Sequence, residues 1–266
     1  MAEIHPTAII NKNAQLGNDV VIGPYVTIDG SVVIGDRTRI IAHAHISGHT
    51  EIGEDCVIHP FAAIGGPPQD YAFGGERSYC RIGAGNEIRE YVSIHRGTKP
   101  ETSTVIGAGC YFMACSHVAH NCEVGDHVIL TNAALLGGYV KVGQRAVVGG
   151  GGAAHQFCRI GEFAMVGGNC TLVQDALPFM VYADRNRCFG LNRVGLRRNG
   201  FSNEEVNELR ELHRRLLRQS GNIRRTAEEI ASSVQTSPGK RLIEFILAES
   251  KRGLCLRSSS TRPPTE

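Results

Sequence analysis

Histidine is the residue type in this sequence with the clearest capacity for chemistry. The chain has 11 histidines, and four of them lie in or beside short motifs that break an otherwise regular pattern: His95, His117, His120 and His155. An imidazole with a pKa of about 6.5 can act as a general base at neutral pH. It can also bind zinc, but a zinc site needs at least three converging side chains, and His117 and His120 need not point the same way across a turn. We therefore expect a histidine general base and no metal site, with zinc as the alternative.

A six-residue period supplies the scaffold for these histidines. From Ile4 to Leu172, with two gaps, every sixth residue is Ile, Val, Leu or Phe at 25 of 26 positions, and glycine often follows. Six matches neither the helical period of about 3.6 residues nor the strand period of about 2. It fits a chain that turns after each short straight side, so that three sides make an 18-residue triangular coil and the coils stack as a parallel β-helix. We expect many of the 32 glycines at turns that need a positive φ or close backbone approach.

Stacking gives His120 defined neighbours, because residues 18 apart lie one above another. Gly138 comes one coil above His120 and Gln156 two coils above, with Gly137 and His155 in the adjacent column. The two glycines leave the space beside His120 without side chains, and the polar pair covers it. Such a space has room for a substrate hydroxyl, and a glycine N–H could approach an oxyanion. The alternative is that the two glycines only mark a turn.

The two gaps in the period predict loops. Residues 65–81 and 96–105 keep the phase of six but carry Asp, Glu or Pro at the inward positions, so we expect them to leave the prism. Long loops on a rigid scaffold often carry function. The period ends after Leu172, and we assign residues 1–189 to the β-helix.

The C-terminal part of the chain predicts helices. Ser202 and Glu205 have the spacing of a capping box, and apolar residues then follow helical spacing until Gly221. We assign residues 190–257 to a helical domain and residues 258–266 to a flexible tail. Within that domain we expect three helices, which start near residues 203, 223 and 240 and end near residues 220, 234 and 252.

Charge divides the chain into two unlike parts. The formal net charge is only +2, which argues against a general nucleic-acid binder. Residues 1–189 carry a net charge of −4, and residues 190–266 carry +6. The expected helices present Arg210, Arg214, Arg215 and Arg218. This arginine-rich face is either an ordinary solvated face or a docking surface for an acidic protein, because guanidinium groups pair with carboxylates.

Composition also bears on location. No stretch approaches the ~20 apolar residues of a membrane span, and the first residues lack the features of a signal peptide. Five of the nine cysteines fall on the small inward position of the repeat, which favours buried small hydrophobes over a disulfide framework. We therefore expect a cytoplasmic protein with reduced thiols.

Several motifs resemble those of one enzyme family. The repeat is similar to that of the left-handed β-helix acyltransferases, and from Ile4 to about Arg252 the chain resembles the UDP-N-acetylglucosamine O-acyltransferases. The motifs that carry this resemblance are, in order, Gln69-Asp70, Ile94-His95-Arg96-Gly97-Thr98, His117-Val118-Ala119-His120, Gly149-Gly150-Gly151-Gly152, His155-Gln156-Phe157, Met165-Val166-Gly167-Gly168, Gly195-Leu196-Arg197-Arg198 and Gly200-Phe201.

The resemblance implies a cytoplasmic homotrimer with active sites between neighbouring prisms. It implies transfer of an (R)-3-hydroxyacyl group to the 3-hydroxyl of UDP-N-acetylglucosamine, the first step of lipid A biosynthesis. The donor is acyl carrier protein, whose phosphopantetheine carries the acyl group, so no further cofactor is expected. His120 matches the catalytic base and Gly138 the amide that stabilises the oxyanion. The acidic carrier protein suits the basic helical end.

The resemblance also implies the residues that bind substrate. Met165 and Gly168 match an acyl groove, in which Gly168 leaves room for a long chain. Asn121 follows the base where many members have Asp, and its carbonyl can still hold the ring. The predicted substrate-binding set is Asp70, His95, His117, Tyr139, His155, Gln156, Asn192 and Arg198. The sequence departs from the family pattern at Tyr139, Ala72 and Val194, where His, Lys and Glu are usual, so a 3-amino acceptor or another acyl length stays open.

Three other functions are alternatives to the acyltransferase. A β-helix carbonic anhydrase needs three converging histidines and leaves the arginine-rich helices unexplained. A non-catalytic scaffold predicts that loss of His120 is harmless. The related N-acyltransferase of the same pathway carries an extra N-terminal domain, for which a repeat that begins at Ile4 leaves no room.

Overall fold

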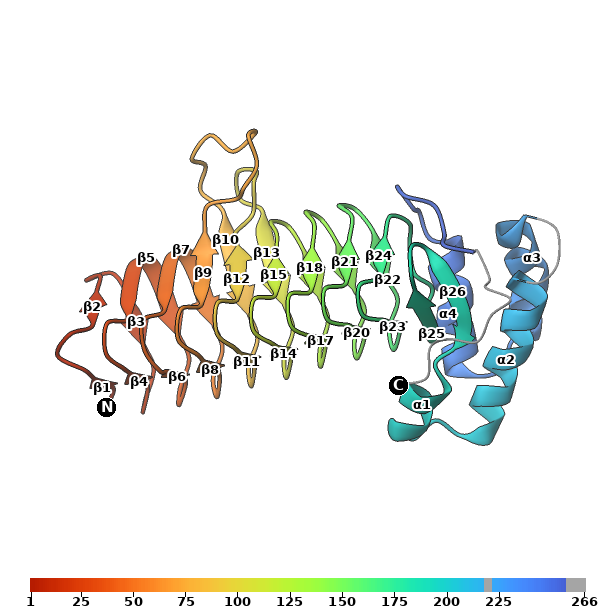
Figure 1. The fold of residues 1–266 in the computed structure, drawn as a ribbon, viewed down its shortest axis with the longest axis horizontal. Helices are drawn as coiled ribbons and strands as arrows, with labels where there is room; N and C mark the ends of the chain where they lie inside the picture. Colours follow the sequence, from red (N-terminus) through yellow and green to blue (C-terminus); the bar gives the residue numbers. More distant parts are fainter. Residues whose placement is uncertain (218–221, 257–266) are drawn as a thin grey trace.

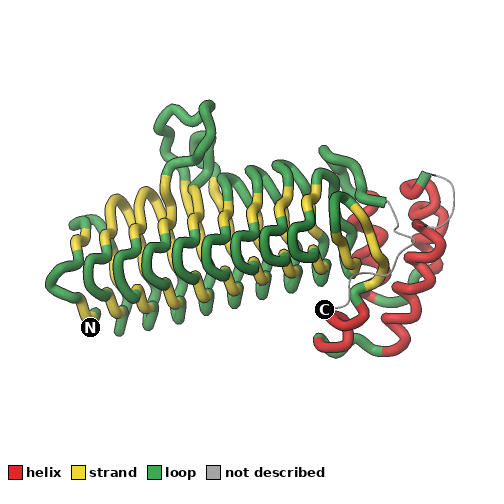
Figure 2. Tube along the Cα trace, in the orientation of Figure 1, coloured by secondary structure: helices red, strands yellow, loops and turns green. Residues whose placement is uncertain are grey.

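Short strands and tight turns wind the chain into a long prism, and helices lie at its C-terminal end (Figure 1). The computed structural model describes residues 1–217 and 222–256. Figure 2 shows the strands as short segments that repeat along the prism, separated by turns of similar length. The parallel β-helix predicted from the six-residue period is confirmed.

The strands form three faces along the prism. One face contains β1 (Glu3–Ile4), β4 (Val21–Ile22), β6 (Arg39–Ile40), β8 (Val57–Ile58), β11 (Glu87–Ile88), β14 (Tyr111–Phe112), β17 (Ile129–Leu130), β20 (Val147–Val148), β23 (Met165–Val166) and β25 (Met180–Ala183). A second contains β2 (Ile9–Ile10), β9 (Ala63–Gly66), β12 (Ser93–His95), β15 (His117–Val118), β18 (Leu135–Leu136), β21 (Ala153–Ala154) and β24 (Thr171–Leu172). A third contains β3 (Gln15–Leu16), β10 (Tyr79–Ile82), β13 (Ser103–Ile106), β16 (Glu123–Val124), β19 (Lys141–Val142) and β22 (Arg159–Ile160). The longer β5 (Thr27–Ile34) and β7 (His45–Ile52) run from the second face onto the third.

Neighbouring coils pair in the register that the period predicts. Glu3 pairs with Val21 and His117 with Leu135, both 18 residues apart. From Ile22 to Leu172 the inward residues of the period are buried in the core, as Ile58 and Val118 are with no exposed surface, whereas Ile4 in the first coil is 47% exposed. Each coil buries its apolar side chains mainly against the coils above and below, so stability depends on stacking.

Glycine is needed here mainly because the coils lie close together. A Cβ at Gly23 would lie 1.7 Å from the carbonyl oxygen of Ile41 in the next coil, and one at Gly53 would lie 2.6 Å from the backbone of Gly83. The left-handed backbone positions at the corners are filled mostly by other residues, such as Asp19 at φ 55°. We expected glycine either at turns with a positive φ or where backbones approach closely. Close approach between neighbouring coils is the more general reason.

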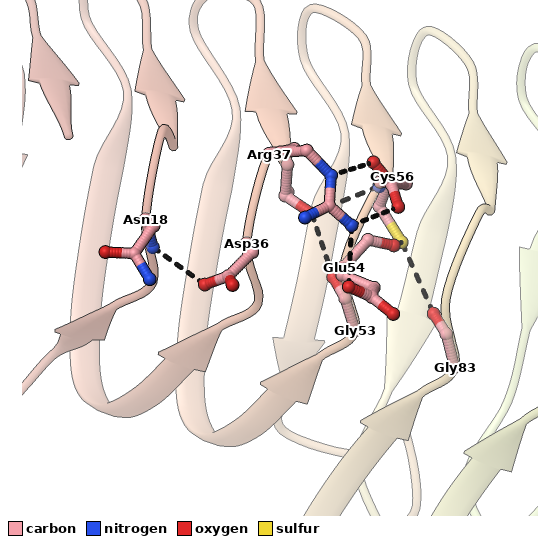
Figure 3. A network of polar contacts seen from close by, with 9 residues as sticks. Asn18, Asp36, Arg37, Gly53, Glu54, Cys56 and Gly83 are labelled. Atoms are coloured by element: carbon pink, nitrogen blue, oxygen red, sulfur yellow. Dashed lines mark hydrogen bonds and ion pairs between the residues drawn. The ribbon is translucent and has the colours of Figure 1, made fainter. Parts of the chain in front are cut away.

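Polar side chains link coils along one corner (Figure 3). The Arg37 guanidinium bonds to both carboxylate oxygens of Asp55 at 2.7 and 2.6 Å and to Glu54 at 2.6 Å. Cys56 lies beside them in the core, where its thiol donates to the Gly83 carbonyl at 3.3 Å. Burial raises the pKa of the Cys56 thiol, so it stays protonated and acts as the small hydrophobe that the sequence predicted.

Two loops leave the prism where the period has its gaps. They span residues 67–78 and 96–102, which is shorter than the predicted 65–81 and 96–105, because β9, β10 and β13 extend into those ranges. They rise together from one edge in Figure 1, and the Glu101 N–H donates to the Arg77 carbonyl at 2.8 Å. Insertions at two successive coils thus form one paired projection.

The C-terminal part differs in detail from the prediction. The antiparallel β26 (Arg187–Leu191) carries the β region past residue 189, and the short α1 (Arg193–Arg198) was not predicted. The capping box is confirmed by reciprocal bonds between Ser202 and Glu205 of 2.8 and 3.2 Å. The helices that follow are α2 (Asn203–Leu217), α3 (Ile223–Ile230) with the 3-10 turn Ala231–Ser233, and α4 (Ser237–Leu247), so the second and third are shorter than expected. Gly221 and the predicted tail 258–266 lie outside the described residues.

A buried ion pair joins the prism to the helices. Asp175 has no exposed surface, and its carboxylate accepts from the N–H and the Nε of Arg159 at 2.8 and 2.7 Å. The Arg159 guanidinium lies 4.2 Å from the ring centroid of Phe245 in α4. The Asp175 backbone also bonds to Gly253 and Cys255, each at 2.8 Å, so the chain returns here to the last coil.

Replacing Asp175 with asparagine is expected to destabilise this junction. Because Asp175→Asn leaves the buried Arg159 guanidinium without its counter-charge, the free energy of unfolding should fall by about 3 kcal/mol. Urea denaturation at fixed protein concentration measures the change. Asp184→Asn is the matched control. Asp184 is exposed and its ion pair with Arg187 is long, at 3.7 Å, so its loss should change the free energy of unfolding by no more than about 0.5 kcal/mol. Equal stability of the two variants would contradict a structural role for the Asp175 pair.

Candidate active site

The candidate active site lies along one edge of the prism. His120 is in the turn from β15 to β16, loop 67–78 connects β9 to β10, and loop 96–102 connects β12 to β13. All three segments cross from the second face to the third, so they share one edge and neighbouring coils. The β-helix thus places residues that are about 20 to 50 positions apart in sequence beside one another.

His120 has a different partner at each ring nitrogen. Its Nδ1 lies 3.0 Å from the Oδ1 of Asn121, and its Nε2 lies 3.6 Å from the Oδ2 of Asp70. Only 12% of the His120 side chain is exposed. The ring of Tyr139 meets it edge to face, with centroids 5.3 Å apart. His120, Asn121, Asp70 and Tyr139, which the sequence placed in one site, are therefore brought together.

Gly138 allows the His120 ring to occupy its position. A Cβ on Gly138 would lie 2.6 Å from both Nε2 and Cε1 of His120. The space that the sequence predicted beside His120 is thus filled in part by the imidazole itself, so the prediction of an open space there was wrong in that detail. Among the described residues, the Gly138 N–H has no hydrogen-bond partner, so it is free to donate to an oxygen.

Loop 67–78 holds Asp70 against the histidine. The Oδ1 of Asp70 accepts from the Ala72 N–H at 3.0 Å, which fixes a tight turn and leaves Oδ2 facing His120. Arg96 secures the base of this loop by donating to the Gly65 carbonyl at 2.9 Å. Its guanidinium also lies 5.2 Å from the ring centroid of Phe73. These roles of Arg96 and Phe73 were not predicted from the sequence.

Two further histidines line the site in their neutral form. His95 and His117 meet edge to face at 4.9 Å. Burial, with smaller effects from His117 and His120, lowers the pKa of His95 to about 4. Burial also lowers the pKa of His117, whose Nδ1 lies 2.7 Å from the Ser93 hydroxyl. Within the described residues the buried Nδ1 of His95 has no hydrogen-bond partner.

An aromatic platform extends from the site towards the helices. Tyr139 and Phe157 stack at 5.0 Å between centroids, and Lys251 lies 4.8 Å from the Phe157 ring. Burial raises the pKa of the Tyr139 phenol, with a smaller contribution from Asp70, so it stays protonated at neutral pH. A cleft of about 560 Å³ opens beside this platform, lined also by Asn121. His155 and Gln156 lie exposed in the turn between β21 and β22, on the same edge.

Four predicted site residues lie elsewhere in the chain. Met165 is in β23 on the first face, and Gly168 is in the turn from the first face to the second. Asn192 caps α1, where its Oδ1 accepts from the Gly195 N–H at 3.0 Å and its Nδ2 donates to the Phe163 carbonyl at 2.9 Å. Arg198 is the last residue of α1. One copy of the chain therefore does not bring these residues to the edge that carries His120.

The arginine-rich face lies partly within the described residues. Arg210 and Arg214 are exposed on α2, and Arg215 is half-buried. Arg214 pairs with Glu211 at 2.7 Å, which neutralises part of its charge. Arg218 lies outside the described residues.

Two features bear on other functions. The described residues contain no group of three His, Cys, Asp or Glu side chains that could hold a metal ion. None of their helices is long and apolar enough to cross a membrane.

Comparisons with known proteins agree with this geometry. Residues 175–255 match the family model described as UDP-N-acetylglucosamine O-acyltransferase, domain 2, and residues 31–66 match the bacterial transferase hexapeptide model. The chain is 45% identical to an acyl-(acyl-carrier-protein)–UDP-N-acetylglucosamine O-acyltransferase of Thermodesulfovibrio yellowstonii, over 96% of this chain and 100% of that protein. It is 40% identical to the enzyme of the same name from Syntrophobacter fumaroxidans, over 95% and 99%.

Solved structures give the same result. The crystal structure of UDP-N-acetylglucosamine O-acyltransferase from Moraxella catarrhalis has a TM-score of 0.89 and 38% identity, over 96% of this chain and 99% of that one. The enzyme from Bacteroides fragilis has a TM-score of 0.90 and 35% identity, over 94% and 99%. These likenesses span almost the whole of both chains, and they agree with the resemblance of the sequence motifs. The chain belongs to the UDP-N-acetylglucosamine O-acyltransferase family.

Proposed function

We propose that the protein transfers an (R)-3-hydroxyacyl group from acyl carrier protein to the 3-hydroxyl of UDP-N-acetylglucosamine, the first step of lipid A biosynthesis. The observation that carries this proposal is the arrangement of His120, whose Nδ1 is held by Asn121 while its Nε2 faces Asp70 above Gly138. A general base needs a ring nitrogen that is not engaged in a hydrogen bond, and Nε2 meets this condition because Asp70 lies 3.6 Å away. Membership of the family supplies the substrates.

The proposed reaction uses one proton transfer in each direction. His120 Nε2 takes the proton of the sugar 3-hydroxyl as its oxygen attacks the thioester carbonyl carbon. The carbonyl oxygen then carries negative charge, which the unpaired Gly138 N–H stabilises. When the carbon–sulfur bond breaks, the thiolate of the phosphopantetheine takes the proton back from Nε2. Asp70 and the neutral His95 and His117 orient the acceptor sugar beside the base.

A neighbouring copy completes the proposed site. Met165, Gly168, Asn192 and Arg198 lie on other faces or on α1, so they serve a site only if another prism presents them to the edge of His120. A homotrimer does this three times. In that assembly Met165 and Gly168 line the acyl groove, and Asn192 and Arg198 of the same copy reach the nucleotide with His155 and Gln156 across the interface.

The donor approaches from the helical end. Acyl carrier protein is acidic, and the net charge of +6 over residues 190–266 attracts it. The described part of the docking face consists of Arg210, Arg214 and Arg215, and Arg218, which the sequence also assigns to it, lies outside the described residues. The carrier's own phosphopantetheine holds the acyl group, so the proposed reaction needs no other cofactor. The proposed location of the reaction is the cytoplasm.

A transfer assay tests this function directly. Purified protein is incubated with UDP-N-acetylglucosamine and a panel of (R)-3-hydroxyacyl carrier proteins of increasing chain length, and acylated nucleotide is measured by mass spectrometry. We expect turnover with one chain length preferred. A parallel series with the 3-amino analogue of the sugar distinguishes ester from amide formation. Absence of product with every donor and both acceptors would refute the proposal.

A further inference from the structure

The Asn121 side chain contacts two groups that come from different segments. Its Oδ1 lies 2.9 Å from the backbone nitrogen of Thr98 in loop 96–102 and 3.0 Å from the Nδ1 of His120. Its own N–H donates to the Thr104 hydroxyl at 2.8 Å, and the residue is 8% exposed. The left-handed backbone at Asn121, with φ 58°, is one that asparagine adopts readily. The amide is therefore buried and held from several sides.

The Thr98 N–H determines which way this amide points. A backbone N–H can only donate a hydrogen bond, so the atom facing it must be the amide oxygen and not the NH2 group. The flipped amide would bury two donors against each other and leave the Thr98 N–H unsatisfied, at a cost of about 1–3 kcal/mol. The oxygen and nitrogen of an asparagine side chain are often hard to tell apart. Here the Thr98 N–H, which can only donate, identifies the oxygen of Asn121.

The tautomer of His120 follows from the same contact. The oxygen fixed by Thr98 is the atom that faces His120 Nδ1, and an oxygen only accepts, so Nδ1 must carry the hydrogen. The Asp70 Oδ2 lies 3.6 Å from Nε2, which is beyond hydrogen-bond distance, so Asn121 and not Asp70 determines the position of the hydrogen. The lone pair of neutral His120 is then on Nε2. Resting on the proposed function, we propose that the backbone amide of Thr98 is a positioning group for catalysis: through Asn121 it holds His120 in the tautomer whose Nε2 is the base.

With asparagine at position 121, loop 96–102 takes part in fixing the tautomer of His120. An aspartate carboxylate at that position would do this without the loop. A carboxylate next to the base has two acceptor oxygens and fixes the tautomer in any orientation, whereas an asparagine does so in only one of two. A chain with asparagine at position 121 therefore depends on a second donor to choose the orientation. Thr98 is 3% exposed, and among the described residues its hydroxyl has no partner, so the backbone N–H is its contribution to the site.

The experiment reads the tautomer without relying on turnover. Full-length protein labelled with ¹⁵N-histidine is studied by long-range ¹H–¹⁵N correlation at pH 8, and His120 is assigned by the loss of its signals in His120→Gln. In the wild type we expect a protonated, pyrrole-type Nδ1 and a pyridine-type Nε2. A pyridine-type Nδ1 would overturn the inference. If the tautomer is as expected but no acyl transfer occurs, the proposed function fails while this inference stands.

Two variants at position 98 form a matched pair. Thr98→Val keeps the N–H and removes only the hydroxyl, so its spectrum should show the same single tautomer as the wild type. Thr98→Pro removes the N–H, and we expect a mixture of tautomers and a kcat lower by about 10–100-fold with little change in KM for the sugar nucleotide. A Thr98→Pro protein that retains a single pyridine-type Nε2 and full kcat would refute the role of the amide.

Asn121→Asp tests the same point without disturbing the loop. The carboxylate accepts from both Thr98 and His120 in either orientation, so this variant should keep the tautomer. In the double variant Thr98→Pro, Asn121→Asp, the carboxylate should restore the single tautomer and much of the lost kcat. It should also move the acid limb of the pH–kcat profile upward, because a carboxylate favours the imidazolium. Failure of the carboxylate to restore the tautomer would count against the proposal.

Discussion

His120→Ala is expected to lower kcat by ~10²–10⁴-fold or more while the prism stays folded. The variant removes the only group in the proposed mechanism that takes the proton of the attacking hydroxyl. His120 is a turn residue outside the core of the prism, and the core contacts of its coil are made by Val118 and Cys122 on either side. Alanine should therefore affect the chemical step far more than stability. Steady-state acyl transfer, with circular dichroism and size-exclusion chromatography as folding checks, measures the effect.

His127→Ala is the control for this experiment. His127 is an exposed turn residue seven positions further along the chain, where its ring lies over Gly109 at a corner away from the catalytic edge. Its removal should leave kcat and KM within twofold of the wild type. Full activity of His120→Ala would exclude the general-base mechanism and favour a non-catalytic scaffold.

Gly138→Ala should be nearly as damaging, for a steric reason. The new Cβ would lie 2.6 Å from Nε2 and Cε1 of His120, where ordinary contacts begin near 3.4 Å, so the imidazole must turn away. A displacement of about 1 Å at a reacting atom can cost about 10²-fold in rate. The Gly138 backbone does not have a positive φ, so alanine is compatible with the turn. We expect a folded protein whose kcat falls by about 10²-fold, measured in the same transfer assay.

Gly150→Ala is the matched substitution on another edge of the prism. A Cβ there would meet its nearest neighbour, the Asn132 carbonyl oxygen, at 3.5 Å, and the residue is exposed. The control should therefore keep its stability and the position of the His120 ring. If Gly138→Ala had normal kcat, the position of the His120 ring above the glycine would not matter to the reaction. A crystal structure of Gly138→Ala should show the ring displaced, and an unmoved ring would contradict the steric argument.

The six-residue period determined the prism and much of the site. The inward aliphatic residue of each side is a local requirement, repeated in every coil, and so it can be read from the sequence without knowledge of distant contacts. The register of 18 follows from it, and with it the placement of Gly138 next to His120. The capping box at Ser202 was readable for the same reason, since both of its partners lie within one helical turn.

Only the tertiary structure decided how the two loops meet the histidine. Loop residues follow no period, so nothing in their spacing predicts that Asp70 faces Nε2 or that the Thr98 N–H bonds to Asn121, 23 residues away. Likewise the repeat does not reveal that Arg159 and Asp175 join the last coil to α4. These contacts depend on where separate segments come to rest against the prism. The pattern of burial repeats in each coil and can therefore be read locally. His120 gains its partners only because its turn and the loops 67–78 and 96–102 lie on the same edge of the prism.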